Sequence, residues 1–484
     1  MNKNSTEKNT YSVDEMMEKL REGDREKREE GELVTREDGT QVLRVKKRKR
    51  RSKQKKEEEA KRRKRNLVLR TFALIAIPLL LGLGIVLQLV RFHSPGFSKG
   101  VVAAVWEKTG ANAKINRLSP LGTKVTAQSL TLAWPDDSPL EQVKATTVSG
   151  DLSLTSFVTG RLGGEELGSE KGYLLTSGRK DRKVSQPKGE AANLVGFKRY
   201  TSDNFSFYFG KVNSPFRLEN SRVRFIPTAY SRQLHLTGGS LISGSWGEVP
   251  LKRGTIEFLE NTMRVVSLRF EEEQRHLIFS GDLDLADSFH SLSVEVVEGN
   301  VGNVGGYGYE RFFESDLAGS TGTLTFRPWN IESHEVTISA KPEYLTLKNL
   351  PFLSVLEELY GDARFQNFEF ELENSFDIVR SSKGSEIKNL DLLELGILAV
   401  KGNLRVEGRE LKGNLKVGLN AHKKLSLRNA QRDELFSKGK LESGFFWFDV
   451  ELSGSVEVPR DNFSSYLQAG PNASDEDLFE QLTR

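Results

Sequence analysis

The chain has 484 residues, of which 37% are hydrophobic and 29% charged, so it is long enough for one large domain or two to three ordinary ones. It contains no cysteine, which excludes disulfides and thiolate metal sites and leaves burial and hydrogen bonding to stabilise the fold. The net charge of +4 is unevenly placed, because residues 1–70 carry 24 Lys/Arg against 15 Asp/Glu and residues 71–484 carry 47 against 52. The basic character therefore belongs to the N-terminal tail.

That tail ends in a dense basic run, and an apolar segment follows it. Lys46–Arg65 holds 14 cations, three anions and few large apolar side chains, so residues 1–65 are predicted to form a charged, disordered or transiently helical cytoplasmic tail. Thr71–Val90 carries no charge, and as a helix it would be about 30 Å long, the thickness of the hydrocarbon core of a bilayer. Residues 67–92 are therefore predicted to form a transmembrane helix. A buried core helix is the alternative, but such helices seldom run this long without a charged face.

The basic run has two interpretations. Taken alone, KKRKRR at Lys46–Arg51 would suit nucleic acid or a nuclear signal. Beside a membrane span, the same cations resist translocation and hold the N-terminus in the cytoplasm, so that residues after Arg91 lie outside it. The second interpretation is favoured, and no nucleic-acid partner is expected. Cleavage as a signal peptide is not expected, because the apolar run is too long and no small-residue cleavage pattern follows it.

After the anchor, apolar and polar residues alternate along many short runs. Alternation with a period of two places one face of a sheet on apolar material and the other in water, as antiparallel sheets do. Many of the 43 glycines lie between these runs, where turns and bulges need them. Residues 115–460 are therefore expected to form a β-rich body. Its apolar face is predicted to include Leu130, Leu132, Trp134, Phe205, Phe207, Phe209, Phe368, Phe370, Leu372, Phe446, Phe448, Val450 and Leu452.

Helical segments are few. Residues 96–114 are predicted to be a short juxtamembrane helix and connector, with the helix over Lys99–Thr109. Phe352–Tyr360 lies between a proline and a glycine, which are helix start and stop signals. Residues 461–484 form a C-terminal tail that would hold a short acidic helix or be frayed. The charged segment Arg179–Gly189 predicts a loop between two strand runs.

Signatures of catalysis and metal binding are incomplete. Gly163–Ser169 has phosphate-loop spacing, but Ser169 stands where the lysine is needed. Ser243–Gly247 lacks the first glycine of a nucleophile elbow. The six histidines are scattered, without the spacing of three or four residues that places two imidazoles on one metal. We therefore predict no enzyme activity, no cofactor and no metal site.

Two stretches resemble the AsmA-like proteins of double-membraned bacteria. LSPLG at Leu118–Gly122, with the alternating run up to Pro135, resembles the first strands of that family. Gly396–Leu419 and LSG at Leu452–Gly454 resemble its C-terminal region. The resemblance implies a single-pass protein of the bacterial inner membrane with its N-terminus in the cytoplasm. It also implies a periplasmic body made of a long twisted antiparallel sheet folded into an open, apolar groove.

A groove of this kind implies lipid transfer between the envelope membranes. Moving two ~16-carbon chains into water costs roughly 25 kcal/mol at about 0.8 kcal/mol per CH₂, and an apolar trough removes most of that cost. The expected partners are phospholipid or another lipid and the inner membrane. Ile115–Val458 would supply about 25 strands, or about 120 Å of sheet at ~4.8 Å spacing, so other envelope proteins or further copies of the chain would extend the groove.

The alternative is a structural or assembly scaffold of the cell envelope. In a scaffold, the same apolar face would be the dry core of a sandwich, and exposed sheet edges would dock other proteins. An anchored carbohydrate-binding or hydrolytic domain is the weakest hypothesis, because the sequence singles out neither paired carboxylates nor exposed aromatic residues. Periodicity does not separate the conduit from the scaffold, since a lipid-filled groove and a protein-filled core require the same alternation.

Overall fold

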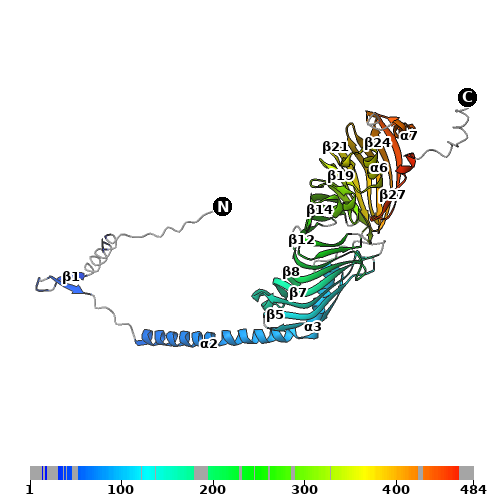
Figure 1. Ribbon diagram of the computed structural model, residues 1–484. Coiled ribbons are helices and arrows are strands. Elements are labelled where there is room, and N and C mark those ends of the chain that lie inside the picture. The colour runs from blue at the N-terminus through cyan, green and yellow to red at the C-terminus, as the bar shows by residue number, and fades with distance from the viewer. Residues whose placement is uncertain are drawn as a thin grey trace, which may run out of the picture. The chain divides into compact units, whose positions relative to one another are not determined.

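A computed structural model shows a mainly β protein with one large mixed sheet (Figure 1). It describes residues 14, 17–18, 31–35, 37–39, 41–45, 53–121, 123–136, 138–178, 195–227, 232–244, 246–259, 262–284, 289–327, 329–422 and 429–467. The chain divides into two compact units, residues 1–83 and residues 84–484.

The first unit contains regular structure within the tail for which the sequence predicted disorder. Strands β1 (Gly31–Thr35) and β2 (Gln41–Val45) pair in antiparallel register. Their connection contains Asp38-Gly39, and Gly39 has the left-handed φ of +76° that such a turn requires. The expectation of disorder was therefore wrong at these residues, because β-branched runs flank a turn signal. Helix α2 (Lys53–Phe92) also begins well before residue 67.

The early start of α2 has a local cause in the sequence. Glu58 and Glu59 stand four residues before Arg62 and Arg63, a spacing that stabilises an exposed helix. Beyond them, described apolar side chains of the uncharged run are exposed, among them Leu74 at 74%. In the described part of the chain, no helix taken singly has the length and hydropathy of a membrane span. Ala76–Phe92 reaches both only in combination with Pro95–Thr109, which meets it at 67°. The span over 67–92 stays a prediction.

The second unit opens with helix α3 (Pro95–Thr109), which confirms the helix expected before Gly110. Ser94 caps its first turn by accepting a hydrogen bond from the Phe97 backbone N–H, and a proline stands at its start. Gly110 ends the helix with a left-handed φ of +67° and donates its N–H to the Trp106 carbonyl. Phe97, with Val101 and Ala104, is buried and docks α3 on the start of the sheet.

The large sheet follows α3. Its first strands are β3 (Asn112–Asn116), β4 (Ser119–Leu121), β5 (Lys124–Ala133), β6 (Leu140–Leu152), β7 (Leu162–Ser177), β8 (Val195–Gly210), β9 (Arg217–Pro227), β10 (Arg232–Thr237), β11 (Ser240–Ser243), β12 (Gly247–Leu259), β13 (Thr262–Glu272), β14 (Arg275–Asp284) and β15 (His290–Glu298). Its later strands are β17 (Thr321–Arg327), β18 (Asn330–Ala340), β21 (Leu372–Ser381), β22 (Gly384–Glu394), β23 (Leu398–Glu407), β24 (Glu410–Asn420), β25 (Lys440–Glu442), β26 (Phe445–Gly454) and β27 (Pro459–Asp461).

One pair of strands corrects the expectation of a wholly antiparallel sheet. β7 and β8 run parallel in register from the pair Leu162 and Val195 to the pair Ser177 and Gly210. A parallel pair needs a long connection that returns the chain to the same end of the sheet. The segment between these strands is long enough for that return. It includes the predicted loop Arg179–Gly189, which lies outside the described residues.

The sheet has two edges. β10 and β11 lie one after the other between β9 and β12 and are separated by Gly238-Gly239, so these four strands form a local ring of pairings. At the ends of the series, β3 and β4 pair with β5, and β27 pairs with β26. Among the described residues, these terminal strands make no pairing with one another.

A second layer covers the sheet over its later strands, and we call it the inner layer (Figure 1). It consists of residues 301–316 and 345–370. Its elements are α5 (Val301–Gly305), η1 (Tyr309–Arg311), β16 (Phe313–Glu314), β19 (Leu345–Lys348), α6 (Pro351–Tyr360), η2 (Ala363–Gln366) and β20 (Asn367–Phe370). β16, β19 and β20 form a separate three-stranded antiparallel sheet. Helix α6 confirms the predicted helix over Phe352–Tyr360 and ends at Gly361 with a φ of +62°.

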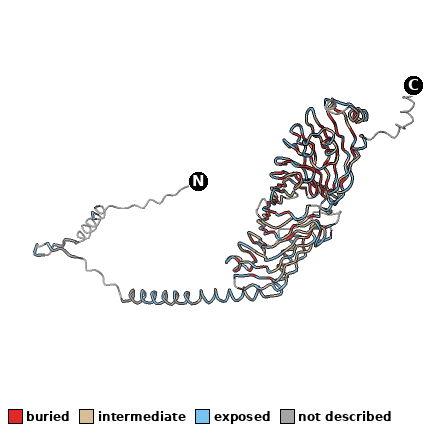
Figure 2. The backbone as a smooth tube through the Cα atoms, in the orientation of Figure 1, coloured by how far each residue is buried: buried red, intermediate tan, exposed pale blue. Residues whose placement is uncertain are grey.

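Three short helical elements complete the description. Helix α4 (Leu154–Thr159) follows β6, α7 (Asn429–Lys438) precedes β25, and η4 (Phe463–Leu467) follows β27. A residue near the chain end, Ser474, at which a short acidic helix was expected to begin, lies outside the described residues. Figure 2 shows that buried residues gather in the later strands, whereas half-buried and exposed residues predominate over the first ones.

The close approach of neighbouring strands predicts different effects for two strand glycines. A Cβ at Gly322 in β17 would overlap the Thr337 carbonyl and come within 2.7 Å of the Ile338 Cα, whereas a Cβ at Gly196 in β8 meets nothing within 4 Å. We expect Gly322→Ala to lower the free energy of unfolding by about 1–3 kcal/mol. Gly196→Ala, the matched control, should change it by less than about 0.5 kcal/mol. Urea unfolding followed by tryptophan fluorescence measures both, and equal effects would contradict the strand packing.

Candidate functional site

An apolar row crosses the first strands of the sheet. Backbone register pairs Ala113 of β3 with Leu132 of β5, Leu132 with Val143 of β6, Val143 with Leu174 of β7, and Leu174 with Phe207 of β8. Residues paired in register project from the same face of a sheet. These five side chains therefore form one continuous stripe across five strands.

A second row lies beside the first. Ile115, Leu130, Ala145, Gly172 and Phe205 are paired in the same succession of strands. The Phe205 ring occupies the space that a side chain at Gly172 would need, because a Cβ there would lie 2.8 Å from two ring carbons. The rings of Phe205 and Phe207 are 5.2 Å apart, which confirms that the two rows share a face. We call these ten residues the open face.

The open face is only partly covered by protein. Phe205 and Phe207 pack against the large core cluster at one end, and Ile115 packs against the cluster around Phe92 at the other. All ten residues are half-buried, and none reaches full burial. Among the described core clusters, none includes Leu132, Val143 or Leu174. The face is therefore apolar and accessible, in contrast to the core of an ordinary two-layer domain.

The open face continues into the sealed core. Phe207 pairs with Leu218 of β9, Leu218 with Leu241 of β11, and Leu241 with Val249 of β12. Leu218 and Val249 are buried, at 9% and 2% exposed, whereas Leu241 between them is half-buried. The same apolar row therefore runs from a half-exposed region to one that the inner layer covers.

A line of three contacting rings connects β8 to β18 where the two regions meet. Phe209 at the end of β8 lies 5.7 Å from Phe216, and Phe216 lies 5.1 Å from the imidazole of His334 in β18. β18 is far from β8 in the order of strands, so this contact curls the sheet back on itself. Burial lowers the pKa of His334, so the imidazole is neutral at neutral pH and packs as an uncharged ring.

The junction of α2 with the body lies near the other end of the open face. Phe92, the last residue of α2, is 2% exposed and lies 4.8 Å from Phe97 of α3 and 5.8 Å from Phe157 of α4, measured between ring centroids. Trp134, the residue after β5, donates from its Nε1 to the carbonyl oxygen of Thr109 at the end of α3, at 2.8 Å. These contacts fix the end of α2 directly beside the first strands.

Polar contacts hold the inner layer in place. Tyr309 is fully buried, and its hydroxyl donates to the carbonyl oxygen of Ser385 at 2.7 Å and lies 3.1 Å from that of Leu404. Burial raises the pKa of Tyr309. Arg380 of β21 donates to the Val304 carbonyl oxygen at 2.9 Å and lies over the ring of Trp246. Burial, followed by the nearby charge of Arg275, lowers the pKa of Arg380 to about 10. These bonds make the inner layer a fixed part of the core.

The structure divides the residues that the sequence predicted for an apolar groove. Leu130, Leu132, Phe205 and Phe207 belong to the open face, and Trp134 and Phe209 stand at its two ends. The others that are described lie in the covered region. Phe368 and Phe370 are 3% and 0% exposed within β20 of the inner layer itself.

Four further predicted residues lie on β26. Phe448, Val450 and Leu452 are 1%, 1% and 4% exposed in the same core, and Phe446 is half-buried with its ring 4.8 Å from Phe436 of α7. The side chain of Leu372, the first residue of β21, lies outside the described residues. The interpretation of Phe368, Phe370 and the β26 residues as the lining of an open groove is therefore corrected: they contact protein.

Sequence reasoning missed the contribution of β3, β6 and β7 to the open face. Val143 and Ala145 alternate with polar residues, as do Gly172 and Leu174 with Tyr173, but small residues in these runs weaken the apolar signal. Their role depends on register with bulkier neighbours on β5 and β8. That register is a property of strand pairing, which one strand's sequence does not specify.

The opposite face of the first strands is polar. Lys198 pairs with Glu165 at 2.6 Å, and Arg199 pairs with Glu166 at 3.3 Å, across the parallel strands. The Lys198 contact lowers the pKa of the Glu165 carboxyl. These pairs are exposed, so they contribute little stability and mark the solvent side of the sheet.

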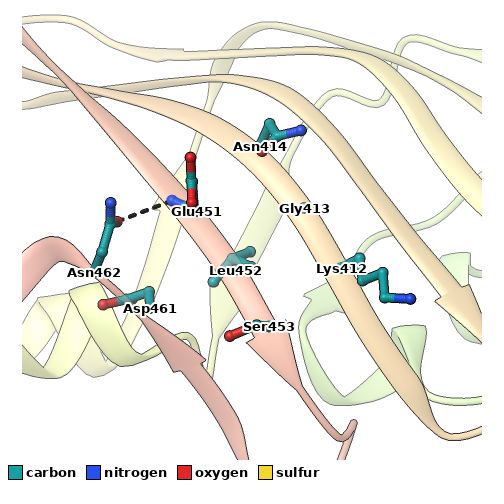
Figure 3. Close-up of a pocket in the computed structure, with 8 residues that line it drawn as sticks. All are labelled: Lys412, Gly413, Asn414, Glu451, Leu452, Ser453, Asp461 and Asn462. Carbon is teal, nitrogen blue, oxygen red and sulfur yellow. Dashed lines mark hydrogen bonds between the residues drawn. The ribbon is translucent and has the colours of Figure 1, made fainter.

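A polar depression of about 430 Å³ lies elsewhere, beside the last strands (Figure 3). Asn462 accepts a hydrogen bond from the Glu451 backbone N–H at 2.9 Å, and Asp461 lies beside Asn462 at its wall. Among the described residues, no group of three or more His, Asp or Glu side chains is arranged to hold a metal ion. The depression offers no apolar surface that continues the open face, so we do not assign it the main function.

The burial of Asp461 predicts that the free energy of unfolding depends on pH. Burial raises the pKa of Asp461, and its Oδ2 atom has no hydrogen-bond partner among the described residues. The protonated form is therefore favoured in the folded state, and this contribution is lost as pH rises through the folded pKa. We expect Asp461→Asn to raise the free energy of unfolding near pH 7, with the gain fading toward about pH 4, in urea titrations across that range.

Asp282 provides the control of opposite sign. The Arg264 guanidinium lowers the pKa of the Asp282 carboxyl, so Asp282→Asn should lower stability slightly at neutral pH and have less effect as pH falls below the ordinary value of 3.8. A gain for Asp461→Asn that does not depend on pH would contradict the assignment of its pKa.

Comparisons with known proteins identify no relative. Searches of protein-family models, of curated proteins and of solved structures each found no match to this chain. The assignment of the site therefore depends on the apolar rows, their exposure and their position beside α2.

Proposed function

We propose that this protein is anchored in the bacterial inner membrane by α2 and binds the acyl chains of phospholipid or another lipid on the open face, for transfer through the envelope. The observation that carries the proposal is the continuous, half-exposed apolar surface of ten residues across β3 and β5 to β8. The side chains of the open face are aliphatic and aromatic, and none of its ten residues is ionic. The opposite face of the same strands carries charged side chains. Such a surface suits a chain of CH₂ groups whose headgroup remains in water.

The position of the face supports the membrane part of the proposal. In the apolar run of α2, several side chains have an exposed fraction above one half, such as Leu80 at 65% and Val90 at 64%. A bilayer would cover them. Phe92 lies two residues after Val90 and is packed on α3 and α4, so a lipid leaving the membrane would meet the first strands. The resemblance to AsmA-like proteins agrees with this arrangement and with a periplasmic body.

The inner layer favours a second role for the later strands. There the apolar face is filled by residues 301–316 and 345–370, with Phe352, Leu356 and Phe370 fully buried. This is the dry core expected of a scaffold, and β27 leaves a short edge that would dock another envelope protein or a second copy. We propose that lipid binding belongs to the first strands and that the later strands are structural.

Photocrosslinking in cells tests the lipid proposal. A benzoylphenylalanine placed at Phe207 in the full chain should form an adduct with radiolabelled phospholipid, because the ring projects onto the open face. The same group at Lys171, which is exposed and apart from the two rows, is the control and should form little adduct. Leu132→Asp should lower the yield at position 207 on the order of tenfold, because a carboxylate beside an acyl chain costs more than about 1.4 kcal/mol. Equal adducts at positions 207 and 171 would contradict the proposal.

If the first strands bind lipid and the later strands are structural, a charged substitution should have different effects in the two regions. Phe370→Asp should unfold the body, since it places a carboxylate at a position that is 0% exposed, at a cost of several kcal/mol. Phe207→Asp should leave the fold intact and remove lipid binding. Limited proteolysis of both variants separates the outcomes. A stable fold with Phe370→Asp would show that the inner layer opens, and would restore the conduit over the whole sheet.

A further inference from the structure

Helix α4 presents an apolar surface that the proposed lipid transfer does not use. Leu154 and Val158, four residues apart on one side of the helix, are 74% and 66% exposed. Phe157 faces the other way and is 8% exposed. The helix therefore buries one aromatic side chain and exposes two aliphatic ones. Segments that bind at a membrane surface also expose apolar side chains in this way.

The structure holds α4 against the last turns of α2. The side-chain amide of Gln88 donates to the carbonyl oxygen of Val158 at 2.8 Å. Gly160 ends α4 with a left-handed φ of +68°, which favours glycine, and the Arg91 guanidinium lies against it, 2.7 Å from where a Cβ would stand. The Phe92 and Phe157 rings add an apolar contact at 5.8 Å. Position and orientation of α4 relative to the end of α2 are thus fixed by three independent contacts.

These contacts place α4 at a defined depth. Gln88 lies within one helical turn of Val90, the last residue of the uncharged run, and Arg91 follows directly. If the run occupies the hydrocarbon core, Val158 lies at the level where hydrocarbon meets headgroups. Leu87 and Val90, 60% and 64% exposed on α2, extend the apolar surface toward the core.

The charges around α4 match a lipid surface. Arg91 and Arg161, both exposed, stand at the end of α2 and directly after α4. Two cations beside an apolar pair favour anionic headgroups, each contributing attraction near the surface. The chemistry is that of a segment which inserts its aliphatic side chains and leaves its cations among phosphates.

We propose that α4 docks into the periplasmic leaflet of the membrane, with Leu154 and Val158 inserted at the interface, and so holds the open face at the bilayer surface. The inference rests on the proposed anchoring by α2. It assigns a second, separate membrane contact, made by the β body itself.

Site-specific fluorescence on the full chain tests this contact. The protein has no cysteine, so Leu154→Cys, Val158→Cys, Leu87→Cys and Val266→Cys each offer a single thiol for the environment-sensitive dye NBD. Each labelled protein is reconstituted into vesicles of phosphatidylethanolamine and phosphatidylglycerol, with and without nitroxide-labelled acyl chains. Val266, 46% exposed on β13, is the matched control: an accessible aliphatic position with no contact to α2.

We expect blue-shifted emission at positions 154 and 158, with nitroxide quenching at least about twofold greater than at position 266, as for an interfacial helix. Quenching at position 87 reports the anchoring itself. Strong quenching at 87, with positions 154 and 158 no more quenched than 266, would overturn the docking of α4 and leave the anchoring intact. Absence of quenching at 87 would overturn the anchoring and this inference with it, whatever the crosslinking at Phe207 shows.

Discussion

The structure depends on one constraint, the need to cover a single apolar face of a very long sheet. Lateral pairing satisfies the backbone groups of each strand, so hydrogen bonding does not limit how far the sheet extends. The burial of apolar side chains does limit its extension, because only one face carries the apolar rows. Covering that face removes apolar area from water at roughly 25 cal/mol per Å², and leaving it bare gives up that gain.

The chain meets this constraint in two ways. Over the later strands it supplies its own cover, and the inner layer brings Tyr309, Phe352 and Phe370 onto the sheet as a closed core. Over the first strands its cover is partial: α3 and α4 bury one cluster there, but side chains such as Leu132 and Leu174 stay half-buried. A fold that seals most of an apolar row and leaves one end open has the geometry of a binding surface with a blind end. For the proposed lipid binding, that geometry favours uptake at one end over passage along the whole sheet.

The junction at Phe92 ties the two apolar surfaces of the molecule together. α2 exposes aliphatic side chains on one side of this residue, and the open face begins on the other. Aromatic contacts of Phe92 to Phe97 and Phe157 join the last turns of α2 to α3 and α4. The position of α4 follows from the same contacts. The proposed anchoring, lipid binding and docking would therefore meet at one small cluster.

The sequence by itself determined the local elements. A period of two predicted strands from Ile115 onward, and proline and glycine at the ends of α6 set its limits, because these signals act over a few residues. Only the tertiary structure decided which apolar residues are open. Phe207 and Phe370 stand in equally regular alternating runs. Phe207 is half-buried on the open face, whereas Phe370 is fully buried. The difference arises because burial depends on segments far apart in the chain, the inner layer above all, whereas periodicity reports only which side of a strand is apolar.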